Sequence, residues 1–135
     1  MQNEIINQIK AFLISKTSAT LIIVFGSFAK GLTHSASDID IAFYSKDKTF
    51  SDYDIFMLAQ ELAGLLKLEV DLVNLKKAST VFQSQIFSSG KVIYSIDEPL
   101  RMNIEMLAFS MYAKLNEERK VILDNVKESG SIHDK

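Results

Sequence analysis

Three aspartates and a glycine–serine pair are the residues of this sequence whose types and spacing could do chemistry. Gly26-Ser27 follows the apolar run TLIIVF, and after ten intervening residues Asp38-Ile39-Asp40 opens the run DIDIAFY. Because residues two apart in a strand project from the same face, Asp38 and Asp40 are expected to point together. Carboxylates beside a core are costly unless something pairs with them, which is the first sign of a site.

A third carboxylate, Asp71, lies in the alternating run LEVDLVNL. If the strands of Asp40 and Asp71 are neighbours, three like charges converge and raise some of the pKa values. A divalent cation removes that repulsion, and hard oxygen ligands favour Mg²⁺. Two ions bridged by shared carboxylates would give the arrangement used in phosphoryl and nucleotidyl transfer.

The glycine–serine pair supplies the complementary half of such a site. Gly26 has no Cβ, so a phosphate can approach its backbone, and Ser27 offers an N–H and a hydroxyl at the start of a helical turn. The alternatives are an ordinary strand–turn–helix junction and a solvated strand face. We interpret Glu69 as a solvated neighbour of Asp71, and Lys30 and His34 as ordinary exposed residues of the intervening loop.

Alternating helices and strands position these residues. Periodicity, caps and turn residues predict helices over 3–16, 51–67, 79–88 and 99–128, and strands over 20–25, 38–44, 68–75 and 91–95, the last at an edge. This order predicts an α/β or α+β fold. We expect one domain over residues 1–128 and a flexible tail over 129–135.

Composition excludes several other classes of protein. The 135 residues suit one domain, and the absence of cysteine excludes disulfides and thiolate metal sites. A net charge of −2 gives no basic footprint for nucleic acid. No secretory leader and no membrane-spanning run is evident, so we expect a soluble, cytoplasmic protein that binds neither nucleic acid nor membrane.

The last predicted helix has more apolar surface than one small domain can cover. One stripe contains Ile104, Leu107, Met111, Leu115, Ile122 and Val126, whereas Met102, Met106 and Phe109 fall nearly opposite. A helix laid on one domain buries one such face. Either its early part inserts between other elements, or one stripe meets a partner or a second copy, giving a hetero- or homo-oligomer.

The spacing GS, ten residues, DID, with a later aspartate in VDLV, resembles the nucleotidyltransferase superfamily typified by DNA polymerase β and kanamycin nucleotidyltransferase. The small size, the stretch ASTVFQSQIFSSGKVIYS and the long last helix resemble the minimal nucleotidyltransferase (MNT) antitoxins, which are encoded beside HEPN-domain ribonuclease toxins. The resemblance runs from the first helix to about Glu128.

The resemblance implies a polymerase β-like fold, with a small mixed sheet flanked by helices and a long C-terminal helix. It also implies transfer of AMP from ATP to a tyrosine of a cognate HEPN toxin, which silences it. By position, Gly26 and Ser27 would bind the triphosphate, and Asp38 and Asp40 would ligate two Mg²⁺ ions. Asp71 would ligate the catalytic ion and assist deprotonation of the acceptor hydroxyl. The chain lacks the substrate-gripping domain of larger relatives, so a partner is expected to complete the site.

Two other functions fit parts of the sequence. The chain could be a stoichiometric antitoxin that docks through its last helix and retains a vestigial nucleotide pocket. It could also be a small-molecule nucleotidyltransferase acting, for example, on an aminoglycoside. The lack of a second substrate domain disfavours the latter, and the intact aspartates disfavour a vestigial pocket.

Overall fold

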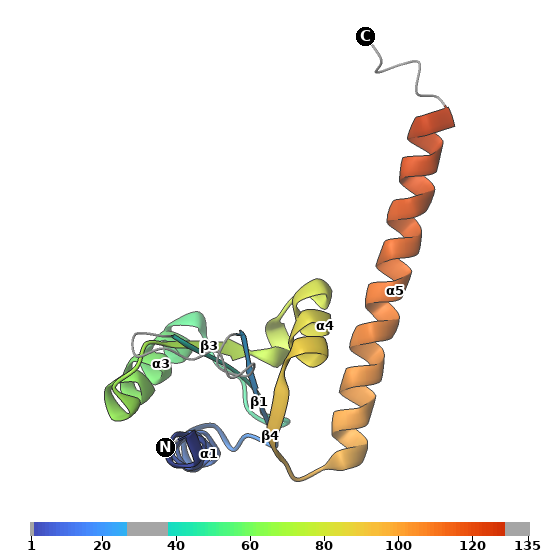
Figure 1. Ribbon diagram of the computed structural model, residues 1–135. Helices are drawn as coiled ribbons and strands as arrows, with labels where there is room; N and C mark the ends of the chain where they lie inside the picture. The colour runs from blue at the N-terminus through green and yellow to red at the C-terminus, as the bar shows by residue number, and fades with distance from the viewer. Residues whose placement is uncertain (1, 27–37, 129–135) are drawn as a thin grey trace.

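A four-stranded sheet with helices on both faces forms the body of the molecule, and one long helix extends from it (Figure 1). The computed structural model describes residues 2–26 and 38–128. Its elements, in chain order, are α1 (Gln2–Thr17), β1 (Leu21–Phe25), β2 (Ile39–Tyr44), α3 (Asp52–Leu66), β3 (Val70–Asn74), the 3₁₀ turn η1 (Leu75–Lys77), α4 (Thr80–Ser89), β4 (Lys91–Ser95) and α5 (Glu98–Glu128). The expected helices and strands are confirmed, with boundaries shifted by a residue or two.

The sheet is mixed, as the resemblance implied. Its strand order is β3-β2-β1-β4, so β4 lies at one edge and β3 at the other. Strand β1 pairs antiparallel with both β2 and β4, whereas β2 and β3 are parallel. Parallel neighbours need a crossover connection, which α3 supplies. This crossover brings β3, with Asp71, alongside β2, with Asp40.

Two hydrophobic cores occupy the two faces of the sheet. Ile39, Ile41 and Phe43, at alternate positions of β2, join α1 and α3 in the larger core. Ala42, from the opposite face of β2, lies with Ile86 of α4 in a smaller core. The helices α1 and α3 therefore cover one face, and α4 covers the other.

The start of α3 is fixed by a capping box. The Ser51 hydroxyl accepts a hydrogen bond from the Asp54 backbone N–H, and the Ser51 N–H donates to the Asp54 carboxylate. The predicted start of this helix is thus confirmed. Leu65, in the last turn of α3, lies at the border of the buried stripe and is 49% exposed.

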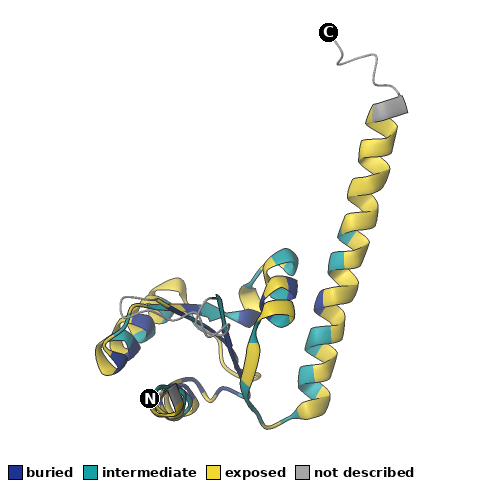
Figure 2. Ribbon diagram, in the orientation of Figure 1, coloured by how far each residue is buried: buried dark blue, intermediate teal, exposed yellow. Residues whose placement is uncertain are grey.

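Helix α5 packs mainly against α4, and Ala108 is its one buried side chain among those described (Figure 2). Its covered face overlaps the predicted stripe only in part: Ile104 and Leu115 are partly buried, but other members of the stripe are not. Leu107 is 60% exposed, and Phe109, expected on the opposite side, contacts the Phe87 ring of α4 at 6.3 Å. Ala108 lies at the centre of the covered face. Because alanine contributes little to a hydrophobic pattern, periodicity alone does not identify this centre. No helix in the described part of the chain is long and apolar enough to cross a membrane.

Candidate active site

Asp40 and Asp71 lie side by side in one row across the sheet. Asp40 is the Cα partner of Phe25 on β1 and of Asp71 on β3. Neighbouring strands are roughly 4.8 Å apart, so the two carboxylates project next to each other. Two residues further along these strands, Ala42 and Val73 contribute to the smaller core. The carboxylates therefore project from the face of the sheet that α4 covers.

The acidic pair has the electrostatic signature of a site. The pKa of Asp40 is raised from an ordinary value of 3.8 to about 6, first by burial and next by a hydrogen bond with Asp71. The negative charges of Asp71 and Asp38 act in the same direction. Because nearby like charges disfavour ionisation, the described residues around the pair favour the neutral form of Asp40.

Asp38 and Glu69 extend the acidic row at the end of the sheet. Asp38 directly precedes β2 and is exposed, and the next residue, Ile39, donates its N–H to the Glu69 carbonyl at 2.9 Å. A hydrogen bond with Asp38, together with the charge of Asp38, raises the pKa of Glu69. Glu69 is exposed, as expected of a solvated neighbour. Its contact with Asp38 was not anticipated from the sequence.

Gly26 is required at its position by the carboxylate of Asp40. Its φ of +75° lies in the left-handed region, and a Cβ built there would overlap the Asp40 Oδ2 atom. The sequence suggested a different reason for the glycine, close approach by a phosphate. The structure shows that Gly26 first makes room for Asp40.

An aromatic pair that was not expected from the sequence borders the acidic row. The ring of Phe25, next to Asp40 in register, meets the ring of Phe82 on α4 edge to face, with centroids 5.8 Å apart. Apolar neighbours of this kind favour the neutral form of a carboxyl group. Only the position of Phe25 beside Gly26 could have signalled this role, because Phe82 is remote in sequence.

Several residues singled out in the sequence lie outside the described residues. These are Ser27 of the glycine–serine pair, Lys30 and His34 of the following loop, and the tail over 129–135. Their predicted roles stay predictions.

The donor chemistry of the acidic row fits a hard divalent cation. Within residues 2–26 and 38–128, no three acidic or histidine side chains already converge on one point. The close pair is Asp40 and Asp71, with Asp38 near enough to influence the pKa of Asp40. Carboxylate oxygens whose mutual repulsion a cation would relieve are the ligands that Mg²⁺ prefers.

Comparisons with known proteins agree with this geometry. Residues 7–99 match the family described as polymerase beta, nucleotidyltransferase. The chain is 40% identical over 106 residues to the protein adenylyltransferase MntA of Shewanella oneidensis, covering 78% of this chain and 75% of that protein.

Solved structures extend the similarity to most of the chain. A toxin–antitoxin crystal structure with AMP-PNP contains a chain that superposes with a TM-score of 0.79 at 36% identity, over 90% of this chain and 98% of that one. An MNT antitoxin in complex with the tri-AMPylated HEPN toxin of Shewanella oneidensis superposes with a TM-score of 0.78 at 34% identity, over 94% and 99% of the two chains.

Proposed function

Because the chain belongs to the polymerase β-like nucleotidyltransferases, as an MNT antitoxin of the MntA family, we propose that it transfers AMP from ATP to a tyrosine of a cognate HEPN toxin and thereby neutralises the toxin. The single observation that carries this proposal is the carboxyl pair of Asp40 and Asp71. The pair is crowded in register on neighbouring strands and lies against the Gly26 turn. A fold alone does not establish an activity, whereas a charged pair of this kind has a chemical use.

The residues divide into two groups by role. Asp38, Asp40 and Asp71 would hold two Mg²⁺ ions, and Gly26 and Ser27 would bind the triphosphate of ATP. When bound, the ions lower the pKa of the acceptor hydroxyl and neutralise charge on the leaving pyrophosphate. The tyrosine oxygen forms a bond to the α-phosphorus of ATP, and the bond from that phosphorus to the bridging oxygen breaks. Asp71 takes the phenolic proton, and pyrophosphate leaves.

Toxin-dependent release of pyrophosphate tests this function. The purified chain is incubated with ATP, Mg²⁺ and unmodified cognate HEPN toxin, and pyrophosphate is measured over time. We expect Asp40→Asn to reduce the rate by more than about 100-fold, as for loss of a charge-stabilising group. The matched control is Asp47→Asn, an exposed aspartate beyond the opposite end of β2, which should act at the wild-type rate. Wild-type turnover by Asp40→Asn would exclude the assigned role of Asp40.

Stoichiometric inhibition is the second candidate function, favoured by the exposed apolar surface of α5. It differs from catalysis in one outcome: an Asp38→Asn/Asp40→Asn variant would still neutralise the toxin in cells. An activity on a small molecule such as an aminoglycoside would instead release pyrophosphate without toxin. A cytoplasmic location, where ATP is available, and a single nucleotidyltransferase domain over residues 1–128 stay predictions.

A further inference from the structure

The second half of α5 stands clear of the body of the molecule (Figure 1). Helix α5 has 31 residues and is therefore about 46 Å long. Its first half packs on α4, but from residue 116 to residue 126 every side chain is exposed (Figure 2). We call residues 116–128 the free half of α5, because this part of the helix extends past α4. Short isolated helices are only marginally stable in water. A projecting helix end is therefore stabilised when it packs against another protein surface.

The free half continues the apolar face that packs on α4. Ile104, Ala108 and Leu115 face α4 or the adjoining core, and at helical spacing the same face continues through Ile122 and Val126. Ile122 is 61% exposed and Val126 is 44% exposed. The stripe therefore extends beyond the end of α4 with no element of the described chain beneath it.

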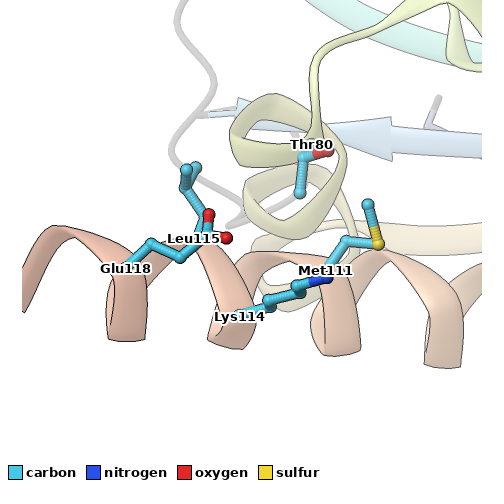
Figure 3. Close-up of a pocket in the computed structure, with 5 residues that line it drawn as sticks. All are labelled: Thr80, Met111, Lys114, Leu115 and Glu118. Carbon is cyan, nitrogen blue, oxygen red and sulfur yellow. The ribbon is translucent and has the colours of Figure 1, made fainter. Parts of the chain in front are cut away.

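A notch lies between the N-terminal end of α4 and the start of the free half (Figure 3). Its volume is about 200 Å³, and it is lined by Thr80 on the first turn of α4 and by Met111, Lys114, Leu115 and Glu118 of α5. A partner protein packed along Ile122 and Val126 would also contact α4 at this notch. The stripe and the notch thus form one continuous surface.

This surface lies on the same side of the sheet as the carboxylates. Helix α4 covers the face from which Asp40 and Asp71 project, and α5 packs on α4. Phe82 of α4 also borders the acidic row through its contact with Phe25. A partner held by the free half is therefore held on the side where the acceptor must arrive.

We propose that the free half of α5, together with the notch at Thr80, is the surface on which the HEPN toxin docks for modification. The inference rests on the proposed function, because it assigns that function its substrate-binding surface. The match to the nucleotidyltransferase family ends at residue 99, so it leaves out almost all of α5. The MNT antitoxin solved in complex with tri-AMPylated toxin nevertheless matches 94% of this chain, so most of α5 is shared with a relative that binds a toxin.

The area available favours the toxin over a second copy of this chain. Thirteen residues span roughly 20 Å, and one helical face of that length provides less than the roughly 800 Å² per partner of a standard interface. A symmetric pair of free halves would therefore be a weak dimer. A toxin whose tyrosine must reach Asp40 necessarily contacts the body of the molecule as well, which supplies the missing area.

A pair of adjacent substitutions tests the docking surface. Ile122→Glu places a charge on the stripe, whereas Val121→Glu places the same charge one residue away and off the stripe, at a similar exposure of 58%. Binding of unmodified cognate HEPN toxin is measured by titration calorimetry, and binding of AMP-PNP serves as the folding control. We expect Ile122→Glu to raise the toxin Kd by about 10-fold or more, as for a residue at the centre of an interface. Val121→Glu should bind within about twofold of wild type, and both variants should bind AMP-PNP normally.

Three results would overturn the docking proposal. One is wild-type toxin affinity for Ile122→Glu, and another is equal weakening by both variants. The third is a wild-type homodimer that Ile122→Glu disperses while toxin affinity is unchanged, which would assign the stripe to a second copy. Failure of the proposed function looks different: toxin binding would depend on Ile122, but the bound toxin would gain no AMP.

Discussion

At the scale of single residues, the stability of the protein and its chemistry conflict most directly at Asp40. Its carboxyl group is partly buried beside Asp71, and burial and charge together raise its pKa to about 6. Folding therefore forces an anion into a place that disfavours anions. The crowding of carboxylates that destabilises the metal-free protein would stabilise a bound cation.

This conflict predicts a pH dependence of stability in the metal-free protein. The folded pKa of Asp40, about 6, is above its ordinary value of 3.8, so the stabilisation is complete below 3.8 and is lost as pH rises through 6. Because the group is partly exposed, we expect this loss to be on the order of 1 kcal/mol between pH 4 and 7. Urea unfolding in EDTA measures it. Asp40→Asn should show a smaller fall over the same range, and parallel profiles for the two proteins would contradict the account.

Two glycines provide a matched test of the Gly26 turn. Gly26→Ala introduces a Cβ against Asp40 Oδ2 at a φ of +75°, so we expect it to destabilise the protein by about 1–3 kcal/mol and to reduce AMP transfer. A Cβ at Gly64, inside α3, meets nothing within 4 Å. Gly64→Ala should therefore stabilise by about 0.5–1 kcal/mol without changing transfer. Thermal unfolding measures the stability of both variants. A Gly26→Ala variant as stable as wild type would refute the contact.

The acidic residues could be identified from sequence because their signal is local. The pair Asp38 and Asp40 is visible as an alternation within one strand. The neighbour relation of Asp40 and Asp71 required an assumption about strand order, which the parallel pairing of β2 and β3 supports. The Phe82 contact and the reason for Gly26 could not be inferred, because each depends on a tertiary contact that no spacing encodes.

At the scale of elements, the best predicted features were those with chemical end signals. The capping box at Ser51 fixed the start of α3. Ser79 caps the start of α4, and Gly90 caps its end. The covered face of α5 was predicted less well. Its centre is Ala108, a small residue that permits close packing but contributes little to a hydrophobic pattern.

Loss of the α3 cap should affect stability and not chemistry. Ser51→Ala removes the hydroxyl that accepts the Asp54 N–H, at an expected cost of about 1 kcal/mol. AMP transfer should be unchanged below the melting temperature, because α3 covers the face opposite the carboxylates. The control is Ser88→Ala, which loses a hydroxyl bond to the Gln85 carbonyl within α4 and should be nearly neutral. A loss of transfer by folded Ser51→Ala would show that α3 contributes to the site.

At the scale of the whole molecule, the chain divides into a nucleotidyltransferase body and an extended helix. Both hydrophobic cores lie before residue 105, and the free half of α5 contributes to neither. The long helix was predicted from the sequence, including its surplus of apolar surface. That its second half stands clear of the body was not, because periodicity identifies a face without identifying what covers it.

Truncation separates these two parts. Removing residues 116–135 should leave the melting temperature within about 2–4 °C of wild type, since little buried surface is lost. The same truncation should abolish modification of the toxin while AMP-PNP still binds. Removing residues 129–135 alone is the control and should preserve modification. A truncated chain that modifies toxin at the wild-type rate would contradict a functional role for the free half.

The central claim is that this chain adenylylates a HEPN toxin, and intact-mass spectrometry of that toxin tests it most directly. The toxin is incubated with the chain, ATP and Mg²⁺, in parallel with the Asp38→Asn/Asp40→Asn variant. We expect the toxin to gain mass in steps of one AMP with the wild-type chain and to gain none with the variant. An unmodified toxin in a stable complex with the wild-type chain would contradict this claim and assign neutralisation to binding alone.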